Sequence, residues 1–107
     1  MEASVRRLLS VLKRRLEAVL EDRLARFVLY GSRARGDYDR GSDIDVAIII
    51  RGSSREDRDR ILREVASVEF EYCRPLSALV LTEEELEHLR SRERRIALDL
   101  DREGIAI

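Results

Sequence analysis

The stretch 31–46, GSRARGDYDRGSDIDV, places three arginines and four aspartates between two apolar segments. Before it, residues 26–31 (RFVLYG) concentrate aromatic and β-branched side chains, which predicts a strand that ends at the glycine. After it, Ile44–Ile50 is apolar on both faces beyond Asp45, as in a central strand that is covered on both sides. Two like charges, Asp43 and Asp45, therefore stand where a buried strand begins.

Helical patterns surround these two strands. From Ala3 to Asp22, apolar residues recur every three or four positions, which predicts an amphipathic helix. One helical turn is expected at 32–35. After Ile50, the turn RGSSRED contains two overlapping capping-box spacings, and either of them would open the next helix. The alternatives are Ser53 with Glu56 and Ser54 with Asp57.

The last third of the chain adds one strand and two helices. Pro75 interrupts the chain, and LSALVLT (76–82) has the composition of a strand. Thr82 and Glu85 form another capping-box pair and start a short acidic helix. Ser91 is expected to begin a final helix that ends at Gly104. The predicted order of elements is αβ(α)βαβαα.

Connection lengths predict the topology. One helix joins the second and third strands, so these two strands should be parallel with a right-handed crossover. A short loop joins the first and second strands and favours antiparallel pairing. We expect an α/β (α+β) fold: a small mixed sheet with Ile44–Ile50 in the middle and helices mainly on one face. Ala47 and Ile49 would then lie on an open face beside the aspartates, which predicts self-association or a partner helix.

Length and composition exclude several classes of protein. At 107 residues we expect one domain, 1–107. The net charge of −1 gives no general attraction to nucleic acid, and the longest apolar run, VAIII, is too short to span a membrane. Without a signal peptide after Met1, and with Cys73 as the single cysteine, we expect a cytoplasmic protein. The absence of Asn and Gln and the abundance of arginine fit a thermophile or a GC-rich genome.

The paired aspartates suggest a metal site. Alternate residues of a strand project from the same face, so Asp43 and Asp45 have Cα atoms about 6.6 Å apart and can converge on one point. Two ionised carboxylates repel each other unless a cation lies between them. Mg²⁺ is the natural cation, because one or two carboxylates and substrate phosphates commonly hold it. The simpler alternative is a capping Asp43 beside a half-exposed Asp45.

The start of the same stretch suggests a phosphate site. Gly31 allows the backbone to approach a ligand, and the free amides of a helical turn that begins at Ser32 would form an anion site. Arg33 and Arg35 are close enough in sequence to add positive charge. The stretch is not a Walker A loop, because no lysine follows Gly36. A triphosphate could therefore lie here, with its metal-bound end at the aspartates.

The motif GS, then ten residues, then DID, with a strand on each side, resembles the minimal nucleotidyltransferase (MNT) domains of the DNA polymerase β superfamily. The resemblance covers nearly the whole chain and implies the nucleotidyltransferase fold. It also implies that Gly31 and Ser32 bind the nucleotide phosphates, while Asp43 and Asp45 are catalytic and ligate Mg²⁺. Such domains commonly pair with a helical HEPN protein as a toxin–antitoxin complex. Some transfer AMP from ATP to a tyrosine of that partner.

One position departs from the family pattern. Active members usually carry a third carboxylate on the next strand, where this chain has Ser77. Glu69 and Glu71 are upstream candidates to replace it, although a solvated helix face explains them as well. Two hypotheses follow: a Mg²⁺-dependent enzyme that transfers AMP to a protein hydroxyl, or a catalytically weak nucleotide-binding subunit that neutralises its partner by binding alone.

Overall fold

The computed structural model of the chain describes residues 2–52 and 54–107. The sheet has the strand order β3-β2-β1-β4, in which β1 is antiparallel to β2 and β4 while β3 is parallel to β2. The predicted mixed sheet, with β2 between its two neighbours, is therefore confirmed. The elements are α1 (Ala3–Leu20), η1 (Glu21–Arg23), β1 (Leu24–Tyr30), α2 (Ser32–Arg35), β2 (Ile44–Ile50), α3 (Arg55–Tyr72), β3 (Leu76–Thr82), α4 (Glu83–Ser91), α5 (Arg95–Glu103) and β4 (Ile105–Ala106).

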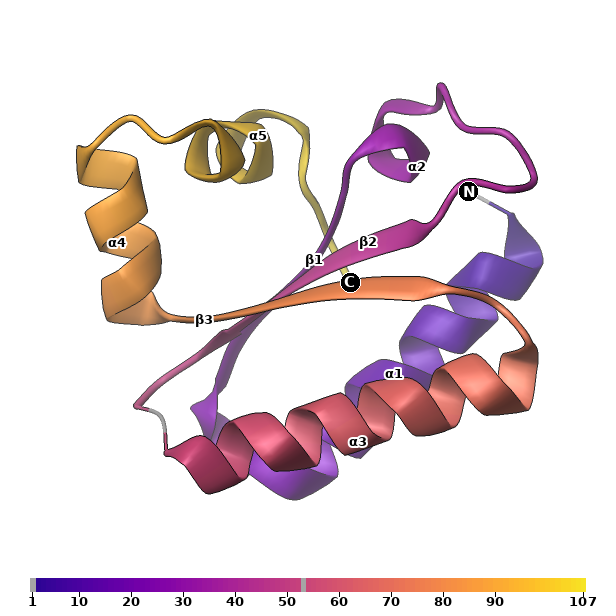
Figure 1. The fold of residues 1–107 in the computed structure, drawn as a ribbon, viewed down its shortest axis with the longest axis horizontal. Coiled ribbons are helices and arrows are strands. Elements are labelled where there is room, and N and C mark those ends of the chain that lie inside the picture. Colours follow the sequence, from indigo (N-terminus) through magenta and orange to yellow (C-terminus); the bar gives the residue numbers. More distant parts are fainter. Residues whose placement is uncertain (1, 53) are drawn as a thin grey trace.

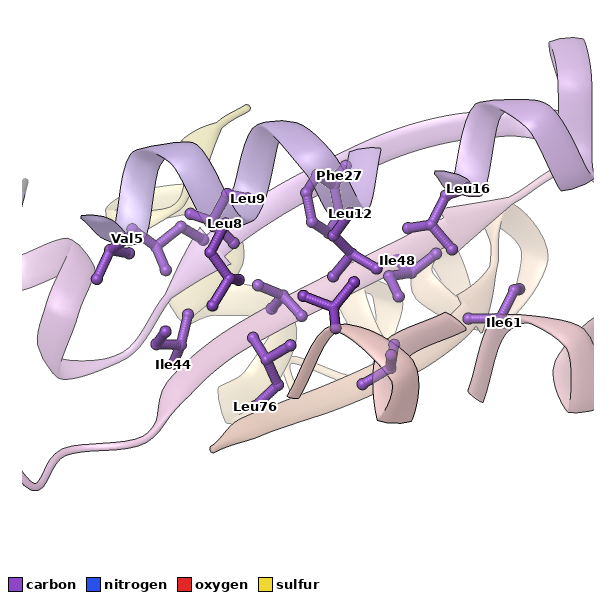
Figure 2. Close-up of a cluster of buried hydrophobic side chains, with 14 of the residues drawn as sticks. Val5, Leu8, Leu9, Leu12, Leu16, Phe27, Ile44, Ile48, Ile61 and Leu76 are labelled. Atoms are coloured by element: carbon purple, nitrogen blue, oxygen red, sulfur yellow. The ribbon is translucent and has the colours of Figure 1, made fainter. Parts of the chain in front are cut away.

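The two long helices cover one face of the sheet. Figure 1 shows α1 and α3 side by side below the strands, with α2, α4 and α5 above them. The apolar stripe of α1 packs on alternate residues of β1 and β2, because side chains on one face of a strand repeat every second position. Figure 2 shows this core, to which Leu8, Leu12, Leu16, Phe27, Ile44, Ile48 and Ile61 contribute.

The other face of the sheet is also covered, and here the sequence-based expectation was wrong. Ala47 and Ile49 are fully buried rather than open to a partner. Leu86 of α4, together with Ala97 and Leu100 of α5, packs over them in a second apolar cluster. The chain therefore supplies its own cover, and the exposed face from which we expected self-association does not exist.

The boundaries of several elements differ from the sequence-based prediction. The first helix ends at Leu20, because Glu21 adopts a positive φ of 55°. Ser91 is the last residue of α4 and does not open the last helix, which begins at Arg95. The short strand β4 was not predicted, because a segment of two residues is too short to show a recognisable alternation of apolar and polar side chains. Among the described residues, no helix combines the length and apolar character needed to cross a membrane.

The capping boxes are confirmed where the structure describes them. Ser54 caps α3 through the amide of Asp57, and the side chain of Asp57 accepts from the backbone of Ser54. Thr82 and Glu85 do the same for α4. The alternative pair of Ser53 with Glu56 cannot be compared, because Ser53 lies outside the described residues.

Asp57 makes stability depend on pH. Arg23 donates to both carboxylate oxygens of Asp57, at 2.6 and 3.0 Å, and this pairing is the main reason that its pKa falls to about 2 from 3.8. Because the pKa of Asp57 is lower in the folded state than in the unfolded state, its ionised carboxylate stabilises the fold above about pH 4. This stabilisation is lost as the pH falls towards 2 and the carboxylate is protonated. We expect Asp57→Asn to lower the thermal midpoint at neutral pH and the deficit to shrink between pH 4 and pH 2.

The control for this experiment is Glu17→Gln, because Glu17 is exposed on α1, away from the Arg23–Asp57 pair, and forms no ion pair with any described residue. Its thermal midpoint should follow the wild type at every pH. A deficit of Asp57→Asn that stayed constant down to pH 2 would contradict the assignment.

Candidate functional site

Asp45 and Gly31 meet where β2 begins and β1 ends. Asp45 pairs with Tyr30 in the antiparallel register, and burial together with the charge of Asp45 raises the pKa of the Tyr30 phenol. A Cβ atom added to Gly31 would lie only 2.4 Å from the Oδ2 atom of Asp45. The backbone of Gly31 has φ 75° and ψ −157°, a conformation that essentially only glycine adopts. Glycine is therefore required here, and it lets the carboxylate pack directly against the turn.

Asp43 brings a second negative charge to the same place. It is exposed just before β2 begins, whereas Asp45 is half-buried. Burial is the main cause that raises the pKa of Asp45, and the charge of Asp43 adds to the increase. Within the described part of the chain, neither aspartate forms an ion pair. Two neighbouring carboxylates thus remain without a protein cation bound to them.

Ser77 occupies the position beside Asp45 on β3. The parallel register pairs these two residues, and the neighbouring Ser77 hydroxyl partly offsets the rise in the pKa of the Asp45 carboxylate. Ser77 therefore lies directly beside Asp45 in the sheet. Residues 2–52 and 54–107 contain no group of three or more His, Cys, Asp or Glu side chains that could hold a metal ion. The site offers two carboxylates and a hydroxyl.

The upstream glutamates do not supply a third carboxylate. Glu69 accepts a hydrogen bond from the backbone amide of Leu76, at 3.0 Å. Glu71 is paired with Arg15 of α1, at 2.6 Å. Both contacts involve α3 and its surroundings on the face opposite to Asp45, so neither glutamate lies beside the paired aspartates, as the helix-face alternative predicts. Glu69 thus stabilises the connection from α3 to β3, and Glu71 stabilises the packing of α3 against α1.

The predicted helical turn at Ser32–Arg35 is present as α2. The amides of Ala34 and Arg35 both donate to the carbonyl of Gly31, at 3.1 Å. The amides that precede them have no partner within the turn, as at every helix start. These donors and the Ser32 hydroxyl follow immediately after the glycine that touches Asp45. The free amides and hydroxyl at the start of α2 are thus adjacent in space to the carboxylate of Asp45.

Arg33 has a different role from the one predicted. Its side chain is only 2% exposed and forms an ion pair with Glu2 at 3.0 Å. Its Nε and Nη2 atoms donate to the carbonyl of Ser42, at 3.2 and 3.0 Å, and its guanidinium lies 4.6 Å from the ring centre of Tyr38. Since these contacts occupy the group, the prediction that Arg33 binds the nucleotide is not retained. Arg33 instead anchors the loop that leads to Asp43.

This anchoring role can be tested by Arg33→Ala. We expect the free energy of unfolding to fall by about 2 kcal/mol, because hydrogen bonds to a charged group contribute about 1.5–3 kcal/mol. Chemical denaturation measures the loss. Arg33→Lys should recover little of it, since one ammonium cannot reproduce the paired contacts to Ser42 and Glu2. Full stability of both variants would refute the role.

Arg35 remains a candidate for phosphate contact. Its side chain is 42% exposed and is paired with Asp37 at 3.2 Å and with Glu103 at 3.1 Å. Its positive charge acts on Asp45 and partly offsets the rise in the pKa of that carboxylate. Arg35 is therefore the arginine of the motif that lies near the aspartates with a solvent-accessible side chain.

The residues present fit Mg²⁺. The ion prefers oxygen donors, keeps several waters and is commonly held by one or two carboxylates with substrate phosphates. Asp43 and Asp45 provide two such carboxylates whose repulsion a divalent cation would relieve. Because residue 31 is a glycine, no side chain at this position occupies the space beside Asp45. A nucleotide bound at α2 would bring its phosphates to the same point.

Sequence comparison identifies the class of protein that this fold and site define. Residues 5–100 match the family described as the nucleotidyltransferase domain, so the chain belongs to that family. The resemblance inferred from the GS and DID motifs is confirmed.

Two particular proteins are similar to the chain. A candidate protein adenylyltransferase of Methanocaldococcus jannaschii is 32% identical over 69 residues, which cover 64% of this chain and 70% of that protein. A candidate nucleotidyltransferase from Sulfolobus solfataricus, known from a crystal structure, has 21% sequence identity and a TM-score of 0.50. That alignment covers 99% of this chain and 86% of the other. At this identity the second match supports the fold alone.

Proposed function

We propose that the protein transfers AMP from ATP to a hydroxyl of a partner protein in a Mg²⁺-dependent reaction. The observation that carries the proposal is the contact between Asp45 and Gly31, which joins a pair of carboxylates to the start of a phosphate-binding turn. Membership of the nucleotidyltransferase family and similarity to a candidate protein adenylyltransferase support it.

In this proposal each residue has a distinct task. Asp43 and Asp45 hold the ion, which when bound neutralises phosphate charge and orients the triphosphate. Ser32 and the first amides of α2 bind the phosphates, and Arg35 adds positive charge beside them. The acceptor oxygen attacks the α-phosphorus and forms a new P–O bond. The bond to the bridging oxygen breaks, pyrophosphate leaves with that electron pair, and the hydroxyl proton passes to water.

The proposed acceptor is a HEPN-family protein encoded beside this chain, with the two acting as a toxin–antitoxin pair in the cytoplasm. The net charge of −1 does not favour binding of nucleic acid. A protein acceptor is therefore the better substrate class for this small domain.

The direct test uses ATP labelled on the α-phosphate, Mg²⁺ and the neighbouring HEPN protein. We expect label on a tyrosine of the acceptor, identified by mass spectrometry, and release of unlabelled pyrophosphate. ATP labelled on the γ-phosphate is the control and should leave the acceptor unlabelled. Absence of label from both nucleotides would contradict adenylyl transfer.

A second candidate function is favoured by Ser77. With a hydroxyl in place of an acid beside Asp45, the chain offers too little negative charge for two Mg²⁺ ions. In this alternative the protein is a nucleotide-binding subunit that neutralises its partner by association alone. An inhibition assay with the partner distinguishes the two: a variant without both aspartates that still inhibits fully would support association.

Ser77→Asp tests whether an acid at this position would strengthen Mg²⁺ binding. A third carboxylate would repel Asp43 and Asp45, so the free variant should unfold at a lower temperature than the wild type. Addition of Mg²⁺ should raise its thermal midpoint more than that of the wild type, since the extra ligand strengthens ion binding. Ser77→Asn, which is similar in size but uncharged, is the control. Equal responses of both variants would rule out a charge effect.

A further inference from the structure

The outer side of α3 carries an apolar stripe that neither the core nor the site explains. Leu62, Ala66 and Phe70 are spaced four residues apart and therefore lie on one side of the helix. The side chain of Phe70 is 88% exposed and that of Leu62 is 50% exposed. Among the described residues only one other large hydrophobic side chain, Ile105, is exposed. Among the described residues, two of the three exposed large hydrophobic side chains, Leu62 and Phe70, thus lie in the α3 stripe.

This stripe lies far from the nucleotide site. Figure 1 shows α3 below the sheet, whereas α2 lies above it. The opposite side of α3 supplies Ile61, Val65 and Val68 to the core. The stripe therefore remains free for a contact with another molecule, and its exposure in a chain with 40% charged residues is unlike the rest of the surface.

We propose that the α3 stripe binds a second copy of this chain, with the two α3 helices antiparallel about a two-fold axis near Ala66. A two-fold axis makes a contact self-complementary. The small side chain of Ala66 lets the helices approach closely at the axis. Leu62 then lies level with Phe70 of the second copy, because both are four residues from Ala66 in opposite directions. Each large apolar side chain acquires an apolar neighbour.

The charges beside the stripe favour this arrangement. Asp59 and Arg63 are exposed, and neither is paired with any residue in the described ranges. Asp59 precedes Ala66 by seven residues and so lies level with residue 73 of the second copy, next to its Arg74. Within residues 2–52 and 54–107, the ion pair of Arg74 is with Glu2, at 3.7 Å. Opposite charges therefore meet at both ends of the contact.

Arg63 adds an aromatic contact. It precedes Ala66 by three residues and lies beside Phe70 of the second copy, where a guanidinium can stack on the ring. The helix has 18 residues and is about 27 Å long, so the contact is small by the standards of stable complexes. We expect a dimer that dissociates at concentrations on the order of micromolar.

Sedimentation velocity over a dilution series, without nucleotide or acceptor, tests the dimer. Wild type should sediment as a dimer when concentrated and as a monomer when dilute. Phe70→Ala should weaken association at least about tenfold. Ile105→Ala removes an exposed hydrophobic side chain elsewhere and should change nothing. Because no reaction is involved, failure of the dimer and failure of adenylyl transfer are separate results.

Cross-linking locates the contact. In a Cys73→Ser background, Ala66→Cys should be joined rapidly by a short bis-maleimide, whereas a cysteine in place of the exposed Ala18 of α1 should not. A monomer at all concentrations, or a dimer that Phe70→Ala leaves intact, would overturn the proposal. It would also be overturned by a chain that is monomeric alone but needs Phe70 to bind the acceptor.

Discussion

Asp45→Asn should reduce adenylyl transfer about 1,000-fold or more. Metal-assisted charge stabilisation contributes several kcal/mol to a transition state, and each 1.36 kcal/mol changes the rate tenfold. The amide keeps the size of the side chain and its place against Gly31 but loses the negative charge that would hold Mg²⁺. Initial rates of label transfer from ATP to the acceptor measure the effect.

The thermal stability of Asp45→Asn shows whether its loss of activity results from misfolding. Burial and the charge of Asp43 raise the pKa of Asp45, so the ionised carboxylate is disfavoured in the free protein. The neutral variant should therefore be at least as stable as wild type at pH 7 without ligand. Mg-ATP should raise the thermal midpoint of wild type only. Glu17→Gln, which removes an exposed and unpaired charge of α1, is the control, and transfer that persisted in Asp45→Asn would refute the metal role.

Gly31→Ala should abolish transfer and destabilise the fold. The backbone conformation of Gly31 costs other residues about 1–3 kcal/mol. The new Cβ atom would also lie 2.4 Å from a carboxylate oxygen of Asp45, so the site has to move. A displacement of about 1 Å can cost about 100-fold in rate. Chemical denaturation and label transfer measure the two effects.

Gly36→Ala is the control for Gly31→Ala. Gly36 also has a positive φ, of 89°, but a Cβ atom there would meet no atom within 4 Å. It should therefore lose a similar amount of stability to backbone strain and keep most of its activity. Equal activity of the two variants would show that the contact between Gly31 and Asp45 is not needed for transfer.

Local patterns were sufficient to predict much of the fold and the centre of the site. The boundaries of β2 and β3, both capping boxes and the parallel β2–β3 pair agree with the sequence-based prediction. Each depends on neighbours in the chain or on the length of one connection. The position of Ser77 beside Asp45 followed from the same strand register.

Contacts between distant segments were not predictable in this way. Arg33 was predicted to add positive charge to the phosphate site because it is close in sequence to Gly31 and Ser32. Its actual partners are Glu2, which is 31 residues away, and Tyr38 and Ser42 in the loop that follows α2. Nothing in the local sequence distinguishes it from Arg35, which is exposed. Burial alone separates the two arginines.

The sequence by itself therefore determined the helices, the three longer strands, and the closeness of the GS turn to two aspartates, since spacing along the chain encodes all three. Only the tertiary structure decided what covers each surface. The apolar spacing of α5 predicts a buried face, but not that Ala97 and Leu100 pack on Ala47 and Ile49. The hydrophobic effect is non-directional, so the pattern of a helix specifies that it is buried and not against which segment.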